Sequence, residues 1–143
     1  MIQKQISVFL ENKPGKLSKF VSLLAENQID LSALSIAETQ DYGILRIIVD
    51  QPDKAVELLR ERDYIVKQTD VIAAVMDDRP GGLSAVLRIL AGAGVSVEYM
   101  YAFVGNRQGH AVVVMRTDAP DKAQQALEEN HVTTLEPKDV YRL

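Results

Sequence analysis

Two short segments of the sequence, Asn12–Leu17 and Asp78–Leu83, carry the residue types best suited to binding a small zwitterion. Each contains a Pro-Gly pair followed by the start of an apolar helical stripe, which predicts a turn that opens a helix. The first N–H groups of a helix have no intrahelical partner and carry a partial positive charge, which suits a carboxylate. Asn12 and Asp78, just before the turn, can accept hydrogen bonds from an ammonium group. Both segments therefore match the chemistry of an amino acid, which offers the two charges close together.

A purely structural role for the two segments is the alternative. Pro-Gly can serve only to form the turn, and Asn12 or Asp78 can serve only to cap the following helix. Gly15 and Gly81 lack a Cβ, so a ligand or a neighbouring backbone could approach them closely. On the residues alone, the two interpretations stay open.

The 143 residues contain no motif typical of catalysis, metal binding or cofactor binding. Cys is absent, and the histidines, His110 and His131, belong to no metal-ligand motif. No catalytic Ser elbow, Walker loop or dinucleotide fingerprint occurs, so we predict no catalytic residue, no metal and no cofactor. The net charge of −4 without a basic block argues against nucleic acid as a partner. No apolar run reaches membrane-spanning length and no signal segment is present, which predicts a cytoplasmic protein without a membrane partner.

The two segments belong to an internal repeat, in which Ile6–Ile36 aligns without a gap with Ile72–Ala102. Asp50–Ala55 matches Asp118–Ala123 as well, once two extra residues are allowed in the second copy near Gly105–Gly109. Identical residues at matching positions include Pro14 and Pro80, Gly15 and Gly81, Leu17 and Leu83, and Ser18 and Ser84. We therefore predict two copies of one module, at residues 1–68 and 69–143. The second copy carries a short C-terminal tail from Glu136 that has no counterpart in the first.

Each copy shows the same succession of strand and helix signals. Apolar residues recur at helical spacing after each Pro-Gly turn, and short β-branched runs bounded by polar residues predict strands. Gly92 and Gly94 suit a helix end. The predicted strands are Gln5–Leu10, Ile29–Ala37, Ile44–Val49 and Tyr64–Lys67, then Val71–Met76, Val95–Phe103, Ala111–Met115 and Val132–Leu135. The predicted helices are Lys16–Glu26, a segment after Asp50 that runs through Leu59, Leu83–Ala91, and a segment after Asp118 that runs through Leu127.

The order βαββαβ, repeated twice, predicts an α+β fold. One antiparallel sheet with both helices on one face is the ferredoxin-like solution for that order. The copies join through residues such as Gln68, Thr69 and Asp70, which are too few for a flexible tether. We therefore expect two ferredoxin-like modules in tandem.

A βαββαβ module with an Asn/Asp-x-Pro-Gly-x-Leu turn after its first strand resembles the ACT domain, a small regulatory module that binds amino acids. The motif stands at residues 12–17 and again at 78–83, and the resemblance covers residues 3–68 and 70–136. In the ACT family the effector usually lies between two modules, at the first turn of one and the second strand of its neighbour. The resemblance implies these candidate ligand-binding residues: Asn12, Lys13, Pro14, Gly15, Lys16, Leu17, Ser35, Asp78, Arg79, Pro80, Gly81, Gly82, Leu83, Tyr99, Met100 and Tyr101.

The second strands differ between the copies. Because alternate strand residues point to opposite faces, Tyr99 and Tyr101 are expected on one face and Glu98 and Met100 on the other. One pair would pack on the helices, and the other would line a pocket or an interface. Ser35 stands where the second copy has Tyr101, and the turns differ as well, with Asn12 against Asp78 and Lys16 against Gly82. We expect two unequal sites.

The resemblance implies a non-catalytic, allosteric regulatory protein. It would bind an amino acid effector between modules and act in trans on an enzyme or transporter of amino-acid metabolism. A homodimer is expected, because sheets of this kind often extend by pairing. A protein-binding adaptor that pairs through exposed strands is one alternative. An acylphosphatase-like enzyme is another, with Arg79 in the phosphate-binding loop, although Pro80 removes an N–H donor from that loop.

Overall fold

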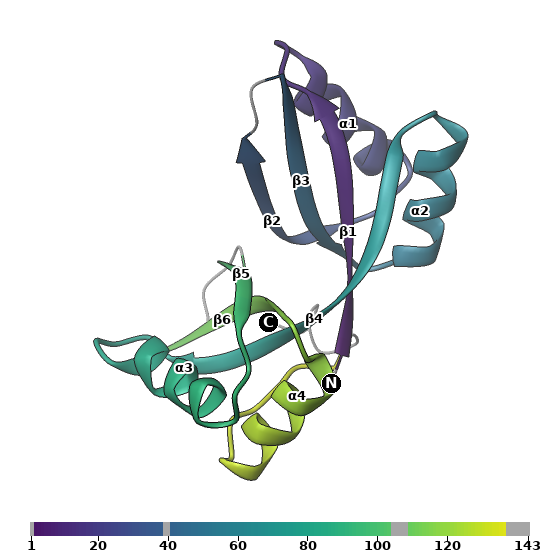
Figure 1. The fold of residues 1–143 in the computed structure, drawn as a ribbon. Helices are drawn as coiled ribbons and strands as arrows, with labels where there is room; N and C mark the ends of the chain where they lie inside the picture. The colour runs from purple at the N-terminus through teal and green to yellow at the C-terminus, as the bar shows by residue number, and fades with distance from the viewer. Residues whose placement is uncertain (1, 39–40, 104–108, 137–143) are drawn as a thin grey trace. The chain divides into compact units, whose positions relative to one another are not determined.

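The computed structural model describes residues 2–38, 41–103 and 109–136 (Figure 1). Its elements are β1 (Ile2–Glu11), α1 (Lys16–Glu26), β2 (Leu31–Glu38), β3 (Tyr42–Val49), α2 (Pro52–Glu61), β4 (Ile65–Asp77), α3 (Gly82–Gly92), β5 (Val97–Ala102), β6 (His110–Thr117) and α4 (Pro120–Glu129). The four predicted helices are confirmed, and the fold is α+β with hydrogen-bonded strand order β2-β3-β1-β4-β6-β5. The tail beyond Glu136, and most of the loop predicted at 105–109, lie outside the described residues.

Lys4–Thr69 form one compact unit, called the N-terminal unit below. There β1 lies between β3 and β4, and β2 flanks β3 at the edge of the sheet. Strand β3 is antiparallel to both β1 and β2, with Ile47 opposite Ile6 on one side and Leu34 on the other. Ile6 and Ile47 share one buried cluster with Phe20 of α1 and Leu59 of α2. Both helices therefore cover the same face of this sheet, as the ferredoxin-like prediction requires.

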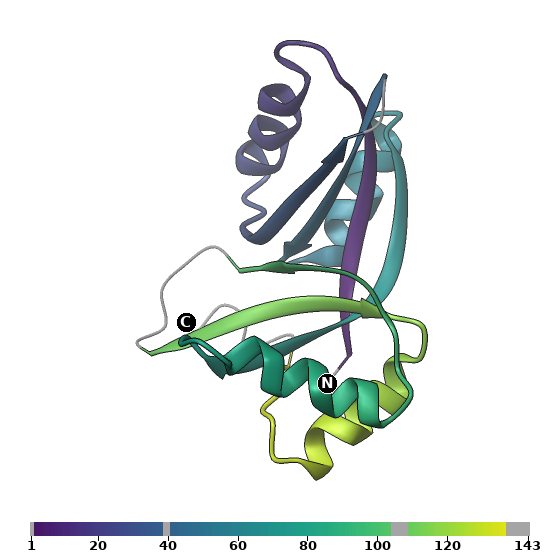
Figure 2. The ribbon, with the colours of Figure 1, turned by 60° about the vertical axis from the view of Figure 1, so that its left-hand side comes forward.

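The described residues from Asp70 onward, together with Ile2 and Gln3, form the C-terminal unit. Strand β6 lies between β4 and β5 and is antiparallel to both. Ile72 and Met115 share a second buried cluster with Leu90 of α3 and Leu127 of α4, so α3 and α4 lie on one face of the sheet (Figure 2). The C-terminal unit thus repeats the architecture of the N-terminal unit.

Strand β4 corrects one prediction about the connection between the copies. The sequence predicts separate strands at Tyr64–Lys67 and Val71–Met76, with three linking residues, whereas the structure has a single strand from Ile65 to Asp77. The intervening residues include neither Gly nor Pro, so nothing interrupts the extended backbone. The strand begins within the N-terminal unit and ends within the C-terminal unit.

The predicted strand Val132–Leu135 is present only as a single β-bridge, between Thr134 and Ala74. Two backbone hydrogen bonds flank the bridge, from Val75 N–H to the Thr133 carbonyl and from Leu135 N–H to the Ala73 carbonyl, each 2.9 Å. The buried Gln3 side chain donates a further hydrogen bond of 2.9 Å to the Leu135 carbonyl. The hydrogen bond from the Gln3 side chain therefore adds to a backbone pairing that is too short to form a strand.

Within the described residues, each of the four helices ends with a residue in the left-handed region, followed by a hydrogen bond back to the last turn. These residues are Gln28, Asp63, Gly94 and His131, with φ of 57°, 64°, 73° and 60°. At α2, for example, Asp63 N–H donates to the Arg60 carbonyl at 3.1 Å and Tyr64 N–H to the Leu59 carbonyl at 2.9 Å. This is the Schellman motif. Of these four helix ends, only the one at Gly94 could be predicted from the sequence, because the other three positions hold residues with a Cβ.

We expect Gln28→Gly to stabilise the N-terminal unit. The left-handed conformation costs a residue with a Cβ about 1–2 kcal/mol, and the greater freedom of Gly in the unfolded chain offsets about 0.5–1 kcal/mol of that gain. Urea unfolding should show a net increase of about 0.5–1 kcal/mol in the free energy of unfolding. Ala25→Gly, three residues earlier and inside α1, is the control and should lose about 1 kcal/mol. Equal losses in both variants would contradict the assigned helix end.

Candidate ligand-binding site

The two Pro-Gly segments form the same turn. In the first, Lys16 N–H donates to the Lys13 carbonyl at 3.2 Å, and Gly15 has φ 84° and ψ −13°. In the second, Gly82 N–H donates to the Arg79 carbonyl at 3.0 Å, and Gly81 has φ 92° and ψ −13°. A Pro followed by a Gly with these angles is a type II β-turn. The sequence prediction of two matching turns that open helices is confirmed.

The glycines of these turns are needed for their backbone angles. Apart from the glycine and its two chain neighbours, no described atom lies within 4 Å of the place where a Cβ would stand on Gly15 or Gly81, so close packing within the chain is not the reason. Their φ values lie where a side chain is strained. The turn also makes Gly15 and Gly81 the N-cap residues, and neither helix start has a side-chain cap.

Asn12 and Asp78 therefore do not cap the helices, which removes the simplest structural role for them. Both side chains are exposed, and each residue is fixed through its backbone. Asn12 N–H donates to the Asp41 carbonyl at 3.0 Å, and Asp78 N–H to the Gly109 carbonyl at 3.0 Å. Their side-chain oxygens remain available to accept a hydrogen bond from a ligand.

A small hollow of about 100 Å³ lies beside the first turn. Its floor is apolar and its rim carries an amide and an ion pair. Leu17 and Ile36, two of its walls, keep 37% and 50% of their surface exposed. The lining residues are Leu10, Glu11, Asn12, Lys13, Leu17, Ile36, Gly43 and Leu45. Because ligand pockets usually measure about 300–1,000 Å³, this hollow is a partial site that needs a further wall.

The rim ion pair joins Lys13 Nζ to Glu11 Oε2 at 3.0 Å. The hydrogen bond from Lys13 and the charges of Lys13 and Lys16 hold the pKa of the Glu11 carboxyl below its ordinary value. The same hydrogen bond and the charge of Glu11 raise the pKa of Lys13. Both side chains are largely exposed, so the pair contributes little to stability and leaves Lys13 able to exchange partners.

The second turn borders a hollow of about 330 Å³ on a different side. This hollow opens between the start of α3 and the segment Val132–Thr133. The Asp77 carboxylate at its rim accepts a hydrogen bond from Arg79 Nε at 3.2 Å and lies 4.0 Å from His110 Nε2. The engaged guanidinium of Arg79, beside a proline that lacks an N–H, gives no support to a phosphate cradle of the acylphosphatase kind.

A protein-family model described as "ACT domain pair" matches residues 1–143. The chain belongs to the ACT domain pair family. The resemblance inferred from the two turns and the element order is thereby confirmed. No curated protein matches it.

Solved structures share the fold of this ACT domain pair. Protein BT0572 from Bacteroides thetaiotaomicron is 43% identical with a TM-score of 0.93, covering 100% of this chain and 98% of that chain. The ligand-free regulatory subunit of aspartate kinase from Thermus thermophilus is 16% identical with a TM-score of 0.65, covering 88% of this chain and 91% of that one. Aspartate kinase from Clostridium acetobutylicum is 16% identical with a TM-score of 0.52, covering 90% of this chain and 33% of that chain. Within the described part of the ACT domain pair, no helix has the length and apolarity to span a membrane.

Not all of the site residues predicted on the second strands, β2 and β5, line a hollow. Ile36 lines the first hollow, whereas its neighbour Ser35 lies on the opposite face of β2 and lines none of the described hollows. In β5, Met100 packs on the core of the C-terminal unit, and Tyr99 and Tyr101 lie on the other face, partly buried. The predicted alternation is therefore confirmed for these three residues.

Glu98 departs from that alternation, because the register of β5 shifts between Val97 and Tyr99. A bulge of this kind re-aims a side chain. The Glu98 carboxylate lies 3.4 Å from Arg116 Nε, and Arg116 is the residue opposite Tyr99. Glu98 thus shares the face of the tyrosines and not that of Met100.

The other predicted site residues divide between lining a hollow and forming a turn. Pro14, Gly15 and Lys16 form the exposed first turn beside its hollow. At the second turn, Asp78, Pro80 and Leu83 are all exposed. The predicted residues that line a hollow are Asn12, Lys13 and Leu17 at the first turn and Arg79, Gly81 and Gly82 at the second. Ile36, Asp77 and His110 line the hollows but were not predicted as site residues. Only Asp77 had a signal in the sequence, because an acidic residue two positions before Arg79 can pair with it.

Proposed function

We propose that this ACT domain pair is a non-catalytic regulatory protein whose amino acid effector binds at the Asn12–Leu17 turn. The hollow beside that turn carries the proposal. It combines an available amide oxygen on Asn12, the start of α1 and an apolar wall from Leu17. A carboxylate suits the free N–H groups at the start of α1, an ammonium suits Asn12, and a side chain suits the apolar wall.

The missing wall of the hollow is proposed to come from a neighbouring ACT module. Strand β2 is an edge strand, and the nearby apolar side chains Leu17, Val21, Leu34 and Ile36 are 37%, 38%, 41% and 50% exposed. An exposed apolar strip beside an edge strand favours association with another module. Pairing of two chains along this edge would form a homodimer and enclose the ligand, as the family's usual site geometry implies.

Regulation is proposed to act in trans, on a separate enzyme or transporter of amino-acid metabolism. Among the similar structures is a chain described as a regulatory subunit of aspartate kinase, which supports this mode of action. The ligand would act by favouring one arrangement or oligomeric state of the modules. Its effect can be no larger than the difference between its affinities for the two states.

A thermal-shift panel of the twenty amino acids is the direct test. We expect one of them to raise the melting temperature, since a ligand at a hundred times its Kd adds about 2.7 kcal/mol of stability. Asn12→Ala and Leu17→Gln should each weaken binding about tenfold, because each removes a direct contact at an exposed position.

The equivalent residues of the C-terminal unit provide matched controls. Asp78→Ala and Leu83→Gln change corresponding, exposed positions and should leave affinity within a factor of two or so. The reverse pattern would move the site to the second turn. The absence of any response to amino acids at millimolar concentration would refute the sensor proposal and favour the adaptor alternative.

A further inference from the structure

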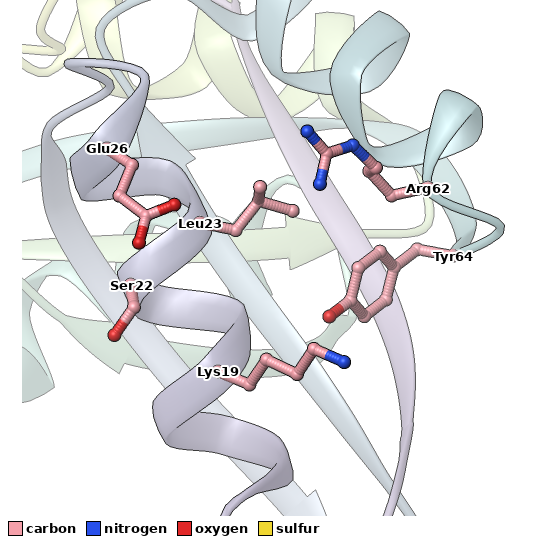
Figure 3. A pocket seen from close by; sticks show the side chains of 6 residues that line it. All are labelled: Lys19, Ser22, Leu23, Glu26, Arg62 and Tyr64. Atoms are coloured by element: carbon pink, nitrogen blue, oxygen red, sulfur yellow. The ribbon is translucent and has the colours of Figure 1, made fainter.

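The N-terminal unit has a second hollow, on its helical face, that shares no residue with the hollow at the turn (Figure 3). Its volume is about 320 Å³, within the usual range for small-ligand pockets. The lining residues are Lys19, Ser22, Leu23, Glu26, Arg62 and Tyr64. The buried Leu23 forms an apolar floor beneath a polar rim.

Helical spacing and a helix end together build this hollow. The four residues from α1 stand at positions i, i+3, i+4 and i+7, and so share one face of that helix. The opposite wall comes from Arg62, the C-cap of α2, and from Tyr64, which follows the left-handed Asp63. The Tyr64 ring packs edge-on against the fully buried Phe20, with ring centroids 5.3 Å apart and planes at 79°. This contact holds the hydroxyl end of Tyr64 at the rim.

The charged groups of the hollow are not engaged with one another. Within the described residues, the side chains of Lys19, Glu26 and Arg62 form no ion pair and no hydrogen bond. Figure 3 shows Lys19 reaching from α1 toward Tyr64, Glu26 lying along α1, and Arg62 and Tyr64 on the facing wall. Two positive groups and one negative group therefore surround a space with an apolar floor.

The repeat shows that the fold does not require this set of charges. The corresponding positions of the second copy are Ala85, Arg88, Ile89, Gly92, Asn130 and Val132. The second copy forms the same helices and the same type of helix end with these residues. Only one of them is charged, namely Arg88, which stands where the first copy has Ser22. The charged set is thus particular to the N-terminal unit and available for a function of its own.

We infer that this hollow binds a small amino dicarboxylate, a molecule with two negative groups and one ammonium group. Its charges are the complement of Lys19, Arg62 and Glu26. The planar guanidinium of Arg62 suits a bidentate carboxylate, and Lys19 acts as a point charge for the second one. Glu26 accepts from the ammonium, Ser22 and Tyr64 offer hydroxyl groups, and the aliphatic backbone of the ligand lies on Leu23. The site is a second effector site, separate from the turn site of the proposed function.

Calorimetric titration of the full chain with L-glutamate and L-aspartate tests the inference. Glutamine and asparagine, which lack one negative group, should bind at least about tenfold more weakly. Lys19→Ala with Arg62→Asn substitutes the residues of the second copy, and the double variant should lose about a hundredfold in affinity. Arg60→Gln removes a neighbouring exposed cation outside the hollow and should leave the affinity unchanged. Glu26→Gln should make glutamate no better than glutarate, its analogue without an ammonium group.

Four outcomes would overturn the inference. The first is that neither acidic amino acid binds at millimolar concentration. The second is that the double variant binds as the unaltered chain does. The third is that inorganic phosphate competes as well as glutamate, which would make the hollow a general anion site. The fourth is that Asn12→Ala and Leu17→Gln abolish the binding of glutamate, which would place it at the turn and support the proposed function instead.

Discussion

Gly82→Lys is expected to destabilise the C-terminal unit by about 3 kcal/mol, although the first copy carries Lys at the equivalent position. Gly82 is buried at the start of α3, and a Cβ placed there would overlap the carbonyl oxygen of Asp77. A backbone carbonyl cannot swing aside as a flexible side chain can, so the end of β4 or the start of α3 must move. The hollow at the second turn would be deformed with it, since both residues line it.

Urea unfolding combined with amide hydrogen exchange would measure this loss for each unit separately, because the two units need not unfold together. The reverse exchange, Lys16→Gly, is the matched control. Lys16 is exposed, and a Gly at a helix start should cost less than about 1 kcal/mol. Gly82→Ala should already show most of the effect, since the overlap begins at the Cβ. Equal and small losses for Gly82→Lys and Lys16→Gly would contradict the packing described for α3 and β4.

Phe20→Ala is expected to cost the N-terminal unit about 3–5 kcal/mol, the usual loss for an aromatic residue removed from a core. Phe20 is fully buried in the cluster between the sheet and both helices. Its edge-on contact with Tyr64 adds about 0.5–1.5 kcal/mol beyond the buried area. Loss of the ring also leaves Tyr64 without its support, so the hollow on the helical face should lose affinity for its ligand as well.

Val21→Ala, at the next residue of α1, is the control because Val21 is 38% exposed, and its loss should stay below about 1 kcal/mol. Phe20→Leu preserves apolar volume and separates the two effects. It should recover much of the stability and little of the support for Tyr64. A Phe20→Leu variant that binds L-glutamate as the unaltered chain does would show that the Phe20–Tyr64 contact is not needed to shape the hollow.

Several features of this protein follow from its sequence alone. The repeat, the four helices, the order βαββαβ and the two Pro-Gly turns all depend on local signals, namely periodicity and the special angles of Gly and Pro. Those signals act over a few residues, so they do not depend on how the rest of the chain packs. The turn motif also carried the family resemblance, since it stands twice in register.

Other features depend on which distant residues the tertiary structure brings together. A single strand β4 across both copies, and a β-bridge where Val132–Leu135 was predicted as a strand, depend on the neighbours available for pairing. Gln28, Asp63 and His131 take left-handed angles because the chain must turn back to its sheet, although nothing in their side chains requires it. The equivalent turns border hollows on different sides, because the residues around them come from other elements.

The Pro-Gly turns were visible in the sequence because their chemistry lies within six consecutive residues. The hollow on the helical face was not, because Lys19 and Tyr64 meet only when α1 packs beside the end of α2. Local propensity determined the elements of this ACT domain pair. The packing of side chains far apart in the sequence decided where a ligand can fit.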